Sequence, residues 1–172
     1  MIKHFAAAAL LAATSVAASA TETPGFYMGV DAGQTKVDYM GNDTAFGVFA
    51  GYQFNRNVSV EANYRDMGKY AFYTSYYDFS TRRSYYGSVN VGMKQTGVSV
   101  LVALPVGSLS LYTRLGYNNL SADAGGVSKS KSGTLAGLGL GYDFTDKVSA
   151  RLEYQRPASD VQNLSAGISY KF

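Results

Sequence analysis

The sequence predicts an all-β protein, a membrane-spanning antiparallel up-and-down β-barrel of eight strands. Three observations lead to this prediction. Apolar and polar residues alternate over segments close to the roughly 9 to 11 residues that cross a bilayer as a tilted strand. Tight turns alternate with long polar connections along the chain, and aromatic residues gather near the ends of the segments.

Residues 1–20 have the pattern of a secretory signal peptide. Lys3 precedes an apolar run that begins at Phe5, and Ala18-Ser19-Ala20 supplies the small residues that precede cleavage. The alternative, a membrane-anchoring helix, needs about 20 apolar residues. We therefore expect residues 21–172 to form one transmembrane β-barrel domain that is complete at Phe172.

Composition excludes several classes of protein. The chain has 15 Tyr, 9 Phe and 19 Gly but only 3 Pro, which favours curved strands over helices. It has no Cys, so no disulfide closes the fold. Without Lys3 the formal charge falls from +3 to +2, and no nucleic acid partner is expected. Beyond the leader, the longest apolar run is Val100–Val106, too short for a spanning helix.

Eight segments have the pattern of such strands. In chain order they are FYMGVDAGQ from Phe26, AFGVFAGYQF from Ala45, VSVEANYR from Val58, TGVSVLVAL from Thr96, LSLYTRLGY from Leu109, TLAGLGLGYDF from Thr134, VSARLEYQ from Val148 and NLSAGISYKF from Asn163. The period of two is clearest from Val58, from Val148 and in the last segment, where apolar residues share one face and polar residues share the other.

The connections between these segments differ in length. Tight turns are expected at 55–57, 105–108 and 145–147, and longer polar connections at 38–44, 67–90, 118–132 and 157–162. Short turns at one end and long loops at the other are typical of bacterial outer-membrane barrels, whose termini lie on the short-turn, periplasmic side. A soluble β-sandwich has no reason for this asymmetry.

Which face points outward distinguishes a membrane barrel from a soluble, lipocalin-like barrel. The charged face is narrow and of mixed sign, which suits pairing inside a lumen. The apolar face carries aromatic residues near strand ends, as interfacial girdles require. These residues are Tyr52, Phe54, Tyr64, Tyr117, Tyr142, Phe144, Tyr154, Tyr170 and Phe172. In hydrocarbon the sheet must close, so we expect the last strand to pair with the strand from Phe26.

The stretches AFGVFAGYQFN, SLSLYTRLGY, SARLEYQ and LSAGISYKF resemble the OmpA-like transmembrane domain family, in order and over residues 21–172. The resemblance implies a small eight-stranded barrel in the bacterial outer membrane, surrounded by its lipids and lipopolysaccharide. It also implies that Tyr170 and Phe172 form the signal that the barrel-assembly machinery reads. Many members continue into a peptidoglycan-binding domain, an activity that is not expected for a sequence that stops at Phe172.

With the apolar face outward, six charged side chains enter the lumen. They are Asp31, Glu61, Arg65, Arg114, Arg151 and Glu153. Charges in a narrow lumen are costly unless paired, and three acids can pair with three bases. The resemblance implies a central bridge between Glu61 and Arg151, with Arg114 and Glu153 around it.

This sequence departs from the family at two lumenal positions. Ala103 and Gly141 stand where relatives often have a lysine and a glutamate, so a second bridge is lost and space is expected there. Inward glycines at 137, 139 and 141 would add to this space, while Phe49 and Tyr112 fill part of the lumen. The interior therefore leaves two functions open, a barrel closed by paired charges and a narrow non-specific diffusion pore.

The connection 67–90 contains KYAFYTSYYDFSTRRSYY. It is either a hairpin that extends its two strands above the membrane or a recognition surface, and the two are compatible. Tyr and Arg are enriched in binding patches, so Tyr73, Tyr76, Tyr77, Arg82 and Arg83 are the candidate contacts for a host, phage or surface-sugar ligand.

No enzyme activity and no cofactor are expected. The only histidine, His4, lies in the leader, and Cys is absent, so the domain has neither a histidine base for a nucleophilic triad nor ligands typical of a transition-metal site. The run GLGLG at 137–141 lacks the helix that follows a nucleotide-binding glycine loop. The sequence thus predicts a structural or surface-recognition barrel, with the narrow pore as the alternative.

Overall fold

The computed structural model describes residues 24–38, 41–78, 82–124 and 127–172, without the side chains at 72–78, 85, 86 and 89. The predicted signal peptide, residues 1–20, lies outside the described residues. No described helix has the length and apolar character needed to cross a membrane.

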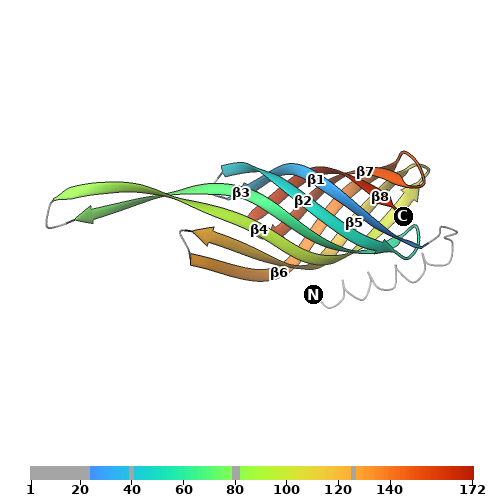
Figure 1. Ribbon diagram of the computed structural model, residues 1–172, viewed down its shortest axis with the longest axis horizontal. Helices are drawn as coiled ribbons and strands as arrows, with labels where there is room; N and C mark the ends of the chain where they lie inside the picture. The colour runs from blue at the N-terminus through green and yellow to red at the C-terminus, as the bar shows by residue number, and fades with distance from the viewer. Residues whose placement is uncertain (1–23, 39–40, 79–81, 125–126) are drawn as a thin grey trace.

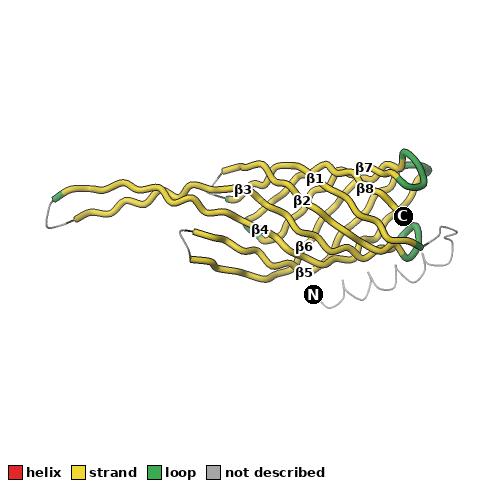
Figure 2. The backbone as a smooth tube through the Cα atoms, in the orientation of Figure 1, coloured by secondary structure: helices red, strands yellow, loops and turns green. Residues whose placement is uncertain are grey.

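Eight antiparallel strands form a closed barrel in which each strand pairs with its neighbours in sequence (Figures 1 and 2). The strands are β1 Gly25–Val37, β2 Gly41–Gln53, β3 Val58–Asp78, β4 Arg83–Val106, β5 Leu109–Ala124, β6 Val127–Asp143, β7 Val148–Ala158 and β8 Val161–Lys171. The barrel closes where β1 pairs with β8, from Tyr27 opposite Lys171 to Val37 opposite Val161. The predicted fold class and the predicted closure are confirmed.

The two ends of the barrel differ as the connections predicted, but the long connections are largely strand. β3 and β4 stay paired from Lys69 opposite Gly92 to Asp78 opposite Arg83, and this hairpin projects well beyond the barrel (Figure 1). Likewise β5 and β6 fill most of 118–132. The predicted hairpin at 67–90, which extends its two neighbouring strands, is confirmed. The connection expected at 118–132 was too long, because β5 and β6 continue their ladder through most of it.

The outer surface of the barrel is apolar. Leu140, Leu152 and Ile168 are about half exposed, at 51%, 49% and 51% of their surface. At the short-turn end, outward rings pack edge to face, with centroid separations of 5.0 Å for Tyr142–Phe144 and 5.4 Å for Tyr170–Phe172. An apolar band bordered by aromatic rings around a polar interior is the arrangement of a transmembrane barrel.

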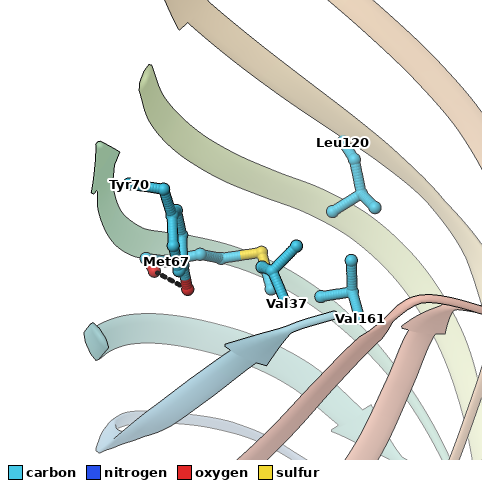
Figure 3. Close-up of a cluster of buried hydrophobic side chains, with 5 residues drawn as sticks. All are labelled: Val37, Met67, Tyr70, Leu120 and Val161. Atoms are coloured by element: carbon cyan, nitrogen blue, oxygen red, sulfur yellow. Dashed lines mark hydrogen bonds between the residues drawn. The ribbon is translucent and has the colours of Figure 1, made fainter. Parts of the chain in front are cut away.

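An apolar plug fills the lumen at the hairpin end (Figure 3). Its buried side chains are Val37, Met67, Tyr70, Leu120 and Val161. The Tyr70 hydroxyl lies 3.1 Å from the carbonyl oxygens of Thr35 and Met67, to which it donates. Burial, with the nearby Asp43 carboxylate, raises the pKa of Tyr70 to about 12, so this hydroxyl stays a donor at neutral pH.

A β-bulge aims one of these side chains, Tyr70, inward. The register between β3 and β4 shifts between Asp66 and Lys69, and Gly68 in the bulge has a φ of +93°, which favours glycine. Without the extra residue, strict alternation would turn Tyr70 outward. With it, Met67 and Tyr70 are both buried in the mouth of the barrel.

Some lumenal glycines make room for aromatic rings on neighbouring strands. A Cβ atom on Gly139 would lie 2.3 Å from Cζ of Tyr112, and one on Gly29 would lie 2.3 Å from Cζ of Phe49. The expectation that Gly139 leaves open space is therefore wrong, since the Tyr112 ring occupies it. Tyr112 and Phe49 are themselves buried in the lumen, at 6% and 4% exposure.

We expect Gly139→Ala to lower the free energy of unfolding by about 1–3 kcal/mol, the usual range for an overpacked interior. The added methyl group must displace the Tyr112 ring from its hydrogen bond to Glu153. The urea midpoint, read from the gel mobility of unheated samples, measures the loss. Gly133→Ala on the same strand is the control, because a Cβ there meets no atom within 4 Å. Equal losses in both variants would contradict the steric explanation.

Candidate functional site: the lumenal charge network and the extracellular hairpin

The six charged residues predicted to enter the lumen come from four strands. Asp31 lies on β1, Glu61 and Arg65 on β3, Arg114 on β5, and Arg151 and Glu153 on β7. Each points inward by strand alternation. Five are at most 5% exposed, and the Arg151 side chain is 11% exposed.

These groups form one chain of alternating charge across the lumen, and Arg151 lies in its middle. Its Nη1 is 2.7 Å from Glu61 Oε2, and its Nη2 is 3.4 Å from Asp31 Oδ2. Asp31 Oδ1 in turn accepts from Arg65, 2.8 Å from Nη2. The bridge that the resemblance implied, Glu61 with Arg151, is thus part of a longer network.

Arg114 continues the chain on the other side. Its Nη2 lies 2.6 Å from Glu61 Oε1, and its Nε lies 2.9 Å from Glu153 Oε1 as an ion pair without hydrogen-bond geometry. Arg114 Nη1 also donates to the Ser99 hydroxyl at 2.6 Å. Each of the three lumenal acids thus accepts hydrogen bonds from several donors. These bonds offset the cost of burying its charge.

Aromatic side chains border the network. The Tyr112 hydroxyl donates to Glu153 Oε2 at 2.7 Å, and the Tyr27 hydroxyl donates to Glu61 Oε2 at 3.2 Å. The guanidinium carbon of Arg151 lies 3.4 Å from the centroid of the Phe49 ring, a cation–π contact. These rings fill the lumen beside the ions and keep water from separating them.

A layer of amides overlaps the hairpin-side part of the charge network and extends toward the apolar plug, and the sequence analysis did not anticipate it. It comprises Asn63, Gln95, Asn118, Gln155 and Asn163, all buried. Gln155 Oε1 accepts from Arg65 Nη1 at 2.9 Å, and Gln155 also donates to Glu153. Inward alternation alone would have identified these positions, but amides carry no charge-pairing signal.

Several atoms of this layer have no partner among the described residues: both polar side-chain atoms of Asn63, Nε2 of Gln95, and the side-chain oxygens of Asn118 and Asn163. Buried amides are normally satisfied by protein groups or ordered water.

A cavity of about 350 Å³ opens at the short-turn end. Ala103 and Gly141 line it, so the two departures from the family pattern coincide with space, as expected. Its deepest lining residues include Tyr27, Tyr112 and Arg151. The cavity is a periplasmic vestibule that reaches the charge network.

The other predicted site residues lie at the two ends of the barrel. Arg82 and Arg83 are exposed at the tip of the β3–β4 hairpin, and Arg82 has a φ of 51°. The predicted contacts Tyr73, Tyr76 and Tyr77 have their backbone in β3, but their side chains lie outside the described part of the chain.

At the opposite end, the two residues of the predicted assembly signal point outward. Tyr170 is 43% exposed and Phe172 is 66% exposed. The Phe172 amide donates to the Phe26 carbonyl at 3.0 Å, which fastens the end of the chain to β1.

In the described residues, no group of three or more His, Cys, Asp or Glu side chains could hold a metal ion. The three lumenal acids are instead separated by arginines.

Comparison with known proteins identifies the family. The model of the outer membrane protein beta-barrel domain matches residues 5–172. The chain belongs to this family. It is 29% identical to outer membrane protein P5 of Haemophilus influenzae, over 94% of this chain and 57% of that protein. The chain therefore spans little more than half the length of this relative.

Solved structures share the fold. Neisserial surface protein A is similar with a TM-score of 0.57 and 24% identity, over 88% of this chain and all of that one. Ail, the attachment invasion locus protein of Yersinia pestis, is similar with a TM-score of 0.52 and 18% identity, over 87% of this chain and 97% of that one. They confirm the predicted barrel fold. The family match confirms the predicted location in the bacterial outer membrane.

We expect Arg151→Ala to lower the free energy of unfolding by about 3–5 kcal/mol, the typical cost of a broken buried ion pair. The substitution leaves Glu61 and Asp31 with fewer counter-charges. Lys147→Ala is the control, because Lys147 lies at the exposed rim, 5.9 Å from the Tyr170 ring centroid. The urea midpoint in lipid measures both.

A double-mutant cycle tests the connectivity of the network. Removing both charges, in Glu61→Gln with Arg151→Met, leaves two neutral pairs, Arg65 with Asp31 and Arg114 with Glu153. We expect the double variant to lose less stability than the sum of the single variants. Strictly additive losses would mean that Glu61 and Arg151 do not interact.

Proposed function

We propose that this outer-membrane barrel is a closed scaffold that presents its β3–β4 hairpin for recognition at the cell surface. The observation that carries the proposal is the combination of a long projecting hairpin (Figure 1) with a lumen filled by side chains. A conducting channel has no need of such a hairpin, whereas a recognition protein needs both a display element and a stable base.

Three successive fillings of the lumen support closure. From the periplasmic vestibule outward these are the charge network, the buried amides and the apolar plug. An eight-stranded barrel is just wide enough for side chains to fill. Five ion pairs hold the charge network across the lumen, so a hydrated ion would have to displace paired charges to pass.

The hairpin suits an anionic ligand. Arg82 and Arg83 are adjacent and exposed at its tip, within a tyrosine-rich segment. Arginine binds sulfate, phosphate and carboxylate groups through paired donors. Ail was crystallised in complex with the heparin analogue sucrose octasulfate. We therefore propose a polyanionic surface sugar, of host or phage-receptor type, as the ligand class.

The alternative function is a narrow diffusion pore, and the periplasmic vestibule of about 350 Å³ favours it. The vestibule would provide the periplasmic half of a conduction path through the lumen if the charge network could rearrange. Insertion by the barrel-assembly machinery, through the outward rings of Tyr170 and Phe172, is part of either proposal.

Planar-bilayer recording separates the two functions. We expect the folded wild-type barrel to show no steady conductance, and Arg151→Ala to remain silent while the amide layer and plug are intact. Folding is checked by the faster migration of unheated samples on a gel. Steady wild-type conductance that changes in Arg151→Ala would instead make the protein a pore with a charged constriction.

Deletion of residues 73–83 tests the role of the hairpin. We expect the shortened barrel to fold with an unchanged urea midpoint, because this segment pairs only within the hairpin. Binding to sulfated or phosphorylated polysaccharide should be lost, and Arg82→Ala with Arg83→Ala should weaken it by about tenfold or more. The control is Lys129→Ala with Lys131→Ala, which removes the same charge from the β5–β6 hairpin. Unchanged binding by the deletion would remove the hairpin from the function.

A further inference from the structure

The vestibule at the short-turn end is a cup that opens to the periplasm. Its volume is about 350 Å³, near the lower limit of the roughly 300 to 1,000 Å³ found for small-ligand pockets. Tyr27, Tyr112 and Arg151 are among its deepest lining residues, and the charge network begins at this floor. A small solute from the periplasm can therefore enter the cup as far as Arg151.

Gly141 leaves part of the wall of this cup uncovered. On the same strand, Gly139 is covered, because a Cβ atom there would lie 2.3 Å from Cζ of Tyr112. A Cβ atom on Gly141 would meet the hydroxyl of Ser110, and the next atom would lie 3.8 Å away. A glycine inside a strand often marks a site where a ligand approaches the backbone closely.

Two hydrogen-bond donors flank Gly141. The strand register places Arg151 of β7 opposite Gly141 on one side and Ser110 of β5 opposite it on the other. All three residues line the cup. An oxyanion that lies over Gly141 would therefore accept hydrogen bonds from a guanidinium and a hydroxyl group together.

The charge network presents a cation to the cup. Among the described residues that line it, Arg151 is the only member of the network, and its side chain is 11% exposed. Its three hydrogen bonds to Glu61 and Asp31 use Nη1 and Nη2, and a guanidinium also carries the Nε–H donor. The acids of the network lie behind Arg151, so the floor of the cup favours an anion.

The other charged residues of the cup add to this preference. Four cations line it against two carboxylates, and they are Arg56, Lys147, Lys171 and Arg151 against Asp143 and Asp146. A concave surface with an excess of one charge raises the local concentration of the opposite ion. The periplasmic mouth of the barrel therefore attracts small anions.

Serine hydroxyls provide a second kind of contact. Ser59, Ser110, Ser149 and Ser169 come from four strands and line the cup. The hydroxyl oxygens of Ser149 and Ser169 lie 2.7 Å apart. A hydroxyl group donates and accepts, so these side chains can bond the hydroxyls of a sugar-like molecule. An apolar solute would displace water from them without replacing its hydrogen bonds.

We propose that the vestibule binds one small periplasmic solute in which an oxyanion, carboxylate or phosphate, is joined to a hydroxylated body. The oxyanion lies over Gly141 between Arg151 and Ser110, and the body lies against Ser149 and Ser169. This site is at the opposite end of the barrel from the proposed recognition surface at the tip of the hairpin, and neither proposal depends on the other.

A mouth that holds only water would account for the serine hydroxyls. It gives no reason for a glycine between Arg151 and Ser110, because glycine weakens a strand and a larger polar side chain would fill the space. Close approach of a ligand to the backbone supplies that reason.

Isothermal titration calorimetry of the refolded barrel in a non-ionic detergent tests the site with glucuronate, glucose 6-phosphate and glucose. We expect one saturable site per barrel for at least one of the two anions. Glucose should bind about tenfold more weakly or worse, because it lacks the charge-assisted hydrogen bonds. The tighter of the two anions identifies the oxyanion as carboxylate or phosphate.

Gly141→Glu tests the position of the oxyanion. Its carboxylate would occupy the place of the ligand between Arg151 and Ser110, so binding of the tighter anion should weaken by about tenfold or more. Gly133→Glu is the matched control. It makes the same change on the same strand at the other end of the barrel, where a Cβ meets no atom within 4 Å, and it should bind as the wild type does.

A second control separates this site from the hairpin. Arg82→Ala with Arg83→Ala should bind the small anions as the wild type does, and loss of binding there would assign them to the hairpin tip. If Gly141→Glu lacks the folded gel band, Ala103→Phe takes its place, because Ala103 lines the cup and a ring there would fill it. Ala50→Phe, at an exposed position on the outer face of β2, is its control.

Several results would overturn the proposal. These are the absence of saturable binding by both anions, or equal binding by the wild type and the variant with the blocked vestibule. Glucose that binds as tightly as the anions would remove the oxyanion from the site. Inorganic phosphate that binds as tightly as glucose 6-phosphate would remove the hydroxylated body.

Discussion

The constraint on which the structure depends is that hydrocarbon offers no hydrogen-bonding partner to the backbone. Within the membrane, every strand must therefore pair on both edges, and β1 must meet β8. Closure fixes the two faces of the sheet. The outer face has to be apolar because it contacts lipid, so all charged side chains of the spanning segments are confined to a narrow lumen, where they have to satisfy one another.

The interior solves this problem with a single chain of alternating charge. Each of Asp31, Glu61 and Glu153 contacts at least one arginine, and Arg114 and Arg151 each contact two acids. No member can be removed without leaving another uncompensated in a site that water reaches poorly. Glycines opposite Phe49 and Tyr112 give these rings the room to pack beside the ions. Ala103 and Gly141 stand where the family resemblance implies a second ion pair. Its absence leaves the vestibule and does not disturb the charge network.

Much of this could be predicted from the sequence, because alternation is a local property. The strands, the outward aromatic residues and the inward positions of the six charges all follow from a period of two. The lengths of the hairpins could not be predicted in this way. Above the membrane a strand ends where its pairing with the neighbouring strand ends, and its own alternation does not mark that point. The inward turn of Tyr70 depends on a bulge at Gly68, and the space beside Gly139 is filled by the ring of Tyr112, its direct partner on the neighbouring strand β5. Such features belong to pairs of strands, so no single segment reveals them.

The same constraint explains why the strands extend to different lengths at one end of the molecule only. Above the membrane, water can satisfy an unpaired strand edge, so β3 and β4 are free to extend as a two-stranded hairpin and β6 is free to outrun β7. The short turns at the other end have no such freedom, because they must return each strand directly to its neighbour. The bulge in β3 lies at the boundary between the two regions and turns Tyr70 into the mouth beside Met67, so the lumen stays filled where the wall ends. The strands can therefore differ in length at the hairpin end without affecting the pairing that keeps the barrel in the membrane.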